Sequence, residues 1–198
     1  MRVRLARANR SSQHWGVEFV QGDGAEAVLT ATVVTAARRD SFSHQFASPP
    51  QIPGWESLPT LPSPSRLSWV SQYEFRFAEG LLALSETPPD PPGSPRSLLW
   101  LRDAPVRPLD FVSLTAMSDA FFGRIFQVIG RIPPFGTVSM TTCFHAGADE
   151  LAAHGDAPLA GVADARIFHR SFGDQSVELW SGAGKLLATG TQMAYFRF

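Results

Sequence analysis

An aspartate stands alone in the most apolar stretch of the sequence. Asp119 follows Met117 and precedes Phe121 and Phe122, and residues 111–129 contain no other acidic residue. Acidic residues are almost never buried without a purpose, and burial disfavours the charged carboxylate unless hydrogen-bond donors hold it. A carboxylate held in this way can take a proton from water as a general base. Asp119 is therefore the first candidate for a catalytic residue. The alternative is that it merely faces water.

Cysteine and histidine residues offer two weaker patterns. Cys143 and His145 lie two positions apart, which places them on one face of a strand, but catalytic Cys–His pairs normally join distant segments. Free cysteine is among the most buried residue types, so we expect Cys143 in the core. The spacing of His145, Asp149, His154 and Asp156 matches no zinc-binding pattern. No metal or other cofactor is expected.

The composition is that of a globular protein without a strongly charged surface. Hydrophobic residues make up 44% of the 198 residues and charged residues 18%, with a formal net charge of −1. This balance gives no electrostatic reason to expect nucleic acid or an anionic membrane as a partner. No run of about 18 apolar residues is present, so no membrane span is expected. Because Cys143 is the only cysteine, we expect a reducing compartment and a cytoplasmic location.

The first part of the chain is predicted to contain strands and no helix. Short alternating stretches bounded by turn residues are typical of strands, and they occur at residues 2–8, 13–21 and 26–36. A proline-rich stretch at residues 47–66 is predicted to be an extended linker, because proline continues neither a helix nor a central strand. Two further strands are predicted at residues 67–78 and 97–102.

The second part combines one helix with several long strands. A buried helix is predicted over residues 110–129, because apolar residues cover nearly every side of it. Asp110 stands where an N-cap is expected, and Gly130 where a C-terminal glycine is expected. A surface loop is predicted at residues 146–157, and four strands at residues 136–145, 161–172, 176–181 and 185–196. The compact solution wraps an antiparallel sheet around the helix, which predicts an α+β fold.

Three segments of the chain resemble the acyl-CoA thioesterase II family, whose members carry two hotdog units in one polypeptide. They are residues 114–119, 136–145 and 187–192. The resemblance runs over nearly the whole chain. It implies a double hotdog, in which an antiparallel sheet wraps around a long central helix. Hotdog units pair through their sheets, so the resemblance also implies a homo-oligomer.

The resemblance further implies an incomplete first hotdog unit. Met1 falls where the third strand of the family's first unit should begin. We therefore expect a partial N-terminal hotdog made only of strands at residues 1–46, the linker at residues 47–66, and a complete C-terminal hotdog at residues 67–198.

The same resemblance implies a reaction. In the family an aspartate, a threonine and a glutamine hold a nucleophilic water, and they correspond here to Asp119, Thr137 and Gln192. We expect an acyl-CoA thioesterase that hydrolyses fatty-acyl-CoA to free fatty acid and CoA, with Asp119 as the base. Thr137 and Gln192 would position the water, because a hydroxyl and a primary amide both donate and accept hydrogen bonds. Taken singly, Thr137 would be an ordinary strand former and Gln192 a solvated side chain.

Two alternative functions stay open. A hotdog hydratase or dehydratase uses a histidine in or beside the central helix, and residues 110–129 contain none. A non-catalytic acyl-CoA-binding or assembly protein would share the fold and bind without turnover. The absence of a Gly-x-Ser-x-Gly sequence argues against a serine hydrolase.

Overall fold

The computed structural model describes residues 1–22, 26–62 and 68–197 of the chain. These residues form two compact units, Met1–His44 and Gln45–Phe198. Parts of the predicted linker (63–66) and of the following strand (67) lie outside the described residues. The division into a partial N-terminal hotdog, a linker and a complete C-terminal hotdog rests on the architecture of the family. It stays a prediction.

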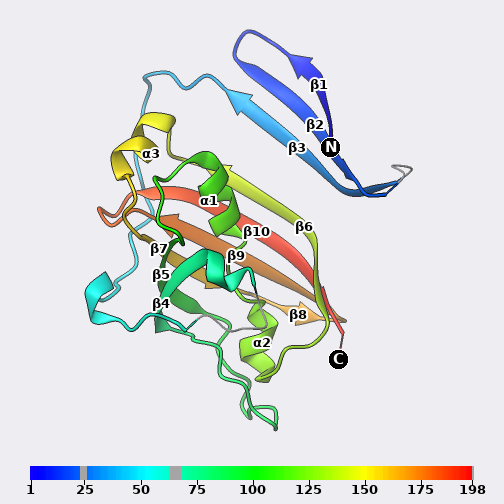
Figure 1. Ribbon diagram of the computed structural model, residues 1–198, viewed down its shortest axis with the longest axis vertical. Helices are drawn as coiled ribbons and strands as arrows, with labels where there is room; N and C mark the ends of the chain where they lie inside the picture. The colour runs from blue at the N-terminus through cyan, green and yellow to red at the C-terminus, as the bar shows by residue number, and fades with distance from the viewer. Residues whose placement is uncertain (23–25, 63–67, 198) are drawn as a thin grey trace. The chain divides into compact units, whose positions relative to one another are not determined.

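The first unit is a three-stranded antiparallel sheet in the order β1-β2-β3 (Figure 1). Its strands are β1 (Arg2–Ala8), β2 (Ser12–Val20) and β3 (Ala27–Ala36), close to the predicted bounds. The side chain of Asn9 shapes the first turn, because its Oδ1 accepts the backbone N–H groups of Ser11 and Ser12 at 2.9 and 2.8 Å. Phe19, Val28 and Val34 of this sheet are 44%, 64% and 56% exposed.

The second unit contains a seven-stranded antiparallel sheet. Its main path runs β4-β5-β7-β9-β10-β6, and β8 pairs with β9. The strands are β4 (Tyr73–Glu79), β5 (Ser97–Asp103), β6 (Phe135–Phe144), β7 (Leu159–Asp164), β8 (Phe168–His169), β9 (Phe172–Trp180) and β10 (Leu186–Phe196). Two short 3₁₀ helices, at Trp55–Ser57 and Val70–Gln72, precede β4.

The helix α1 (Phe111–Ser118) lies across one face of this sheet (Figure 1). Leu114 and Met117 of α1 are buried in one core cluster with Leu99, Leu101 and Leu179 from the strands. One face of α1 therefore packs on the sheet, as the predicted α+β arrangement requires. The other face is exposed, with Phe111 and Val112 39% and 71% accessible, so α1 is not buried on nearly every side as its apolar pattern predicted. No helix among the described residues is long and apolar enough to cross a membrane.

The predicted helix over residues 110–129 is interrupted in the structure. Its two ends are as predicted: the Asp110 side chain accepts the N–H of Ser113 at 2.7 Å, and Gly130 adopts a left-handed conformation with φ of 68°. Between these ends, α1 stops at Ser118 and α2 (Arg124–Ile129) starts a second helix. The apolar pattern does not reveal the break, because the intervening residues are themselves mostly apolar.

Two other sequence expectations are corrected. The predicted loop at residues 146–157 contains α3 (Ala148–His154), whose first turn is stabilised by Glu150 accepting the N–H of Gly147 at 2.6 Å. The predicted strand 161–172 is divided into β7 and β8, because the Asp174 side chain holds the N–H groups of residues 166 and 167 in a turn.

The proline-rich segment packs on the second unit. The indole Nε1 of Trp100 donates to the carbonyl of Pro53 at 2.8 Å. The guanidinium groups of Arg76 and Arg102 lie 4.1 and 4.8 Å from the ring centre of Trp55. Such contacts between a cation and an aromatic face are favourable, so the described part of this segment is held along β4 and β5.

Candidate active site

The structure brings the three predicted site residues together at the break between the helices. Asp119 follows α1, Thr137 lies on β6, and Gln192 lies on the neighbouring strand β10. The Gln192 Nε2 atom lies 3.0 Å from Asp119 Oδ1 and 2.6 Å from Thr137 Oγ1. A primary amide nitrogen has two hydrogens, so Gln192 donates to both partners. The Thr137 hydroxyl thereby accepts from Gln192 and keeps its own hydrogen for another partner.

The end of α1 is tied to the sheet directly before Asp119. The Ser118 Oγ atom donates to the carbonyl of Thr115 at 2.7 Å and lies 2.9 Å from the hydroxyl of Thr142 on β6. The backbone N–H of Asp119 points back to the carbonyls of Ala116 and Met117. These contacts fix the backbone that carries the carboxylate.

Asp119 is less buried than the sequence indicated. It was expected inside an apolar helix, whereas it follows the last helical residue and its side chain is exposed. Its carboxyl group is nevertheless surrounded by enough protein for burial to raise its pKa, an effect that the hydrogen bond from Gln192 partly offsets. The pKa of nearby Tyr73 is also raised, by burial first and then by the charges of Asp103 and Asp119.

A small cavity lies beside the carboxylate. Its volume is about 20 Å³, and a polar cavity of roughly 10–15 Å³ or more can hold one water molecule. Asp119 and Gln192 line it, together with residues that include Ser118, Phe121, Met140 and Gln175. Thr137 reaches the site through its hydrogen bond to Gln192. Asp119 offers a water bound there a hydrogen-bond acceptor. The Thr137 hydroxyl is the remaining donor, because both Nε2 hydrogens of Gln192 are already used.

Two further residues of the site were missed by the sequence analysis. Gln175 on β9 donates from Nε2 to the Gln192 Oε1 atom, and its own Oε1 accepts the backbone N–H of Arg124 at 2.6 Å. Arg124 is only 1% exposed. Its guanidinium donates to the carbonyl of Phe122, within the helix break, and to the hydroxyl of Ser97. A lone arginine in an apolar helix was a visible signal, whereas the role of Gln175 depends on strand register.

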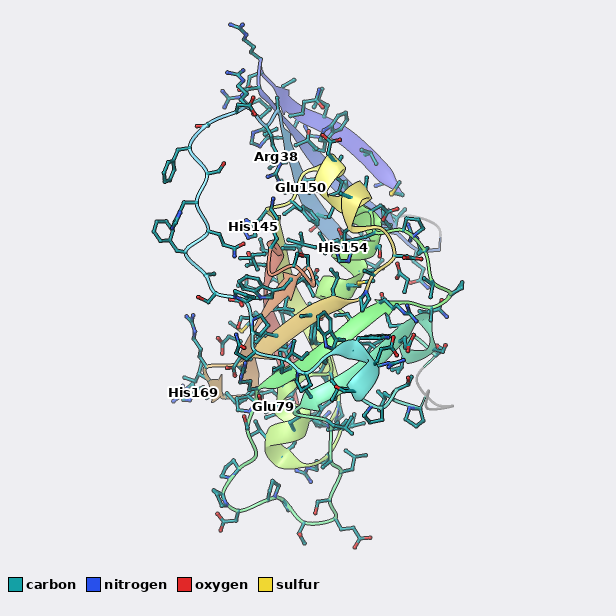
Figure 2. The ribbon with its side chains drawn as sticks, turned by 90° about the vertical axis from the view of Figure 1, so that its left-hand side faces the viewer. Arg38, Glu79, His145, Glu150, His154 and His169 are labelled. Carbon is teal, nitrogen blue, oxygen red and sulfur yellow. The ribbon has the colours of Figure 1, made fainter. Side chains whose placement is uncertain are left out.

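The other candidate residues form no comparable site. Cys143 was expected in the core, but it is exposed on the edge strand β6. His145 follows β6, and its Nε2 atom lies 3.0 Å from the Thr189 hydroxyl, while His154 lies on α3 (Figure 2). Among residues 1–22, 26–62 and 68–197, no group of three potential metal ligands is found.

Comparison with known proteins decides the family. Residues 44–196 match the model of the acyl-CoA thioesterase C-terminal domain. The chain belongs to the acyl-CoA thioesterase family. The matched region contains Asp119, Thr137 and Gln192, and the family resemblance predicted from the sequence is confirmed. No match was found among curated proteins.

Solved structures confirm the fold. A conserved protein of unknown function with a hotdog fold, from Alicyclobacillus acidocaldarius, is 36% identical with a TM-score of 0.90. The match covers 99% of this chain and 71% of that one. The acyl-CoA thioesterase II TesB2 from Mycobacterium marinum is 18% identical with a TM-score of 0.74, over 99% of this chain and 72% of that one. This member of the thioesterase family therefore has the predicted hotdog fold of the α+β class.

Proposed function

We propose that the protein hydrolyses fatty-acyl-CoA thioesters to free fatty acid and CoA. The observation that supports this most is the contact of Asp119 and Thr137 with one amide group, that of Gln192, beside a cavity the size of one water. A carboxylate next to a held water is the arrangement that general-base hydrolysis needs. Membership of the thioesterase family supplies the class of bond that is cleaved.

In the proposed reaction Asp119 removes a proton from the water as the water oxygen attacks the thioester carbonyl carbon. The tetrahedral intermediate then expels the CoA sulfur as the carbon–sulfur bond breaks, and the proton taken by Asp119 passes to the leaving thiolate. Gln192 donates to Oδ1, which leaves Oδ2 for the water. Thr137 can donate its hydroxyl hydrogen to the same water because its oxygen already accepts from Gln192.

The direct test is release of CoA thiol from acyl-CoA substrates of increasing chain length. We expect turnover with fatty-acyl-CoA, and the chain-length profile would define the preferred substrate. The alternative is a binding or assembly protein on the same fold. Saturable acyl-CoA binding without thiol release at any chain length would favour that alternative and remove the proposed activity.

Replacing the two positioning residues should weaken the reaction without abolishing it. Thr137→Val and Gln192→Ala should each lower kcat by up to about tenfold. Each removes one hydrogen bond to a reacting group, from Thr137 to the water or from Gln192 to Asp119. One such bond contributes about 0.5–1.5 kcal/mol, and 1.4 kcal/mol corresponds to about tenfold. Steady-state kinetics would measure this, with Thr141→Val on the same strand as the matched control. Loss of activity as large as that of an Asp119 variant, with binding unchanged, would contradict the division of roles.

The pH dependence should report the raised pKa of Asp119. The base works only when deprotonated, so kcat/KM should fall as the pH drops through a pKa above the usual range of aspartate. Gln192→Ala removes the hydrogen bond that lowers this pKa, so the acidic limb of its pH–rate profile should move to higher pH. An acidic limb that stays in place, or moves to lower pH, would disprove this coupling.

We also propose that copies of the chain associate through their sheets. The strand β6 (Phe135–Phe144) is at one end of the second sheet, and most of its residues are not buried. An unpaired edge strand presents N–H and C=O groups that can pair with another strand. The molar mass in solution, measured by light scattering, would show whether association occurs.

A further inference from the structure

The orientation of the Gln192 amide decides whether this site can work. A glutamine amide has a donor end and an acceptor end of nearly the same shape, and rotation by half a turn exchanges them. In the observed orientation Nε2 faces Asp119 and Thr137. In the reversed orientation Oε1 would face the Asp119 carboxylate, so two acceptors would oppose each other and the carboxylate would lose its donor. Asp119 itself disfavours that reversed orientation, and a fixed donor at the Oε1 end of the amide disfavours it further.

A backbone N–H at the helix break supplies a fixed direction. The first N–H groups of a helix have no partner within the helix, and a backbone N–H can only donate. The N–H of Arg124, the first residue of α2, donates to Gln175 Oε1 at 2.6 Å. Gln175 Oε1 is thereby held by α2, and Gln175 Nε2 points away from α2.

Gln175 in turn orients the amide group of Gln192. The two glutamines are directly opposite each other in the register between β9 and β10, so their side chains lie on the same face of the sheet. Gln175 Nε2 donates to Gln192 Oε1. With its Oε1 held in this way, Gln192 presents Nε2 to Asp119 and Thr137.

We infer that Gln175 is a positioning residue, which transmits the direction of the Arg124 N–H to Gln192 and so keeps Gln192 as a donor to Asp119. The inference rests on the proposed function, because it concerns the same carboxylate. Gln175 acts through Gln192 and is not expected to touch the water. Replacing Gln175 should therefore have little effect on kcat in a variant that lacks the Gln192 amide.

Two substitutions separate the direction of the hydrogen bond from simple packing. Gln175→Met keeps a side chain of similar length but neither donates nor accepts strongly, so Gln192 loses the donor that holds its Oε1. Gln175→Glu still accepts from Arg124 but cannot donate to Gln192, so it favours the reversed orientation. We expect kcat to fall about tenfold for Gln175→Met and further for Gln175→Glu, with KM changed by less than about twofold. Gln51→Glu, at an exposed position, makes the same chemical change away from the site.

A double-mutant cycle tests whether the effect passes through Gln192. In a Gln192→Ala background, Gln175→Met should change kcat by less than about twofold, since coupled residues show non-additive effects. Wild-type kcat in Gln175→Met, or a tenfold loss that persists in the Gln192→Ala background, would overturn the inference. Thermal unfolding of each variant identifies any that fail to fold.

A readout that needs no turnover separates this inference from the proposed function. The Asp119 carboxyl can be titrated by ¹³C NMR, and Gln175→Met should move its midpoint to higher pH, because the carboxylate loses a fixed donor. The same substitution should leave the midpoint unchanged in the Gln192→Ala background. A midpoint unmoved by Gln175→Met would refute the positioning role even if hydrolysis were confirmed. The expected shift would support that role even if no acyl-CoA were hydrolysed.

Discussion

Replacing Asp119 by asparagine should lower kcat by about 10²–10⁴-fold while leaving the fold intact, because this is the usual contribution of a general base. The asparagine amide has the size of the carboxylate, and its oxygen can still accept the hydrogen bond from Gln192. It cannot take a proton from water at neutral pH. Single-turnover rates with a fatty-acyl-CoA, compared with the melting temperature of each protein, would measure both effects.

The matched control for this variant is Asp156→Asn, which makes the same change at an exposed position beyond α3. It should keep the wild-type rate. Turnover near the wild-type value in Asp119→Asn would remove Asp119 from the mechanism, and with it the reason for assigning water activation to this site.

Arg124→Met should destabilise the second unit by about 3 kcal/mol, since a buried polar group left without its partner costs about 1–3 kcal/mol. The guanidinium of Arg124 is the donor to the Phe122 carbonyl and to the hydroxyl of Ser97. Burial lowers its pKa to about 10, so the side chain remains charged at neutral pH. For a chain of this length we expect a melting temperature lower by roughly 6–12 °C.

The same substitution at a surface arginine provides the control. Arg96 forms an exposed ion pair with Glu79 at 3.6 Å, and such pairs contribute at most about 1 kcal/mol. Arg96→Met should therefore shift the melting temperature much less. Equal stability of Arg124→Met and wild type would show that the acceptors at the helix break find other donors.

Local sequence signals predicted most of the strands and the ends of the helical region, but not α3 or the break between α1 and α2. Asp110 and Gly130 mark those ends because a capping carboxylate and a left-handed glycine act within a few residues of themselves. The single acid in the apolar stretch also identified Asp119. Its partners, Thr137 and Gln192, came only from the resemblance to the family, because a threonine or a glutamine has many other uses in a strand.

The remaining features depend on contacts between distant segments. The break after Ser118 is stabilised by Arg124 and Gln175. The apolar pattern of the helix gives no indication of these polar contacts. Gln175 meets Gln192 only because of the register of β9 against β10. Cys143 is exposed because β6 is an edge strand, a position that depends on the order of all the strands.

The central claim is that water held by Asp119 attacks the thioester directly. A single turnover in water enriched in ¹⁸O, with enzyme in excess over fatty-acyl-CoA, tests it by mass spectrometry of the fatty acid and of the peptide that contains Asp119. Direct attack predicts that the fatty acid gains one ¹⁸O and that the peptide gains none. If Asp119 instead attacked the substrate to form an anhydride, which water then cleaved at the aspartyl carbonyl, the fatty acid would carry unlabelled oxygen from Asp119. The peptide would then acquire the ¹⁸O, and that result would contradict the account.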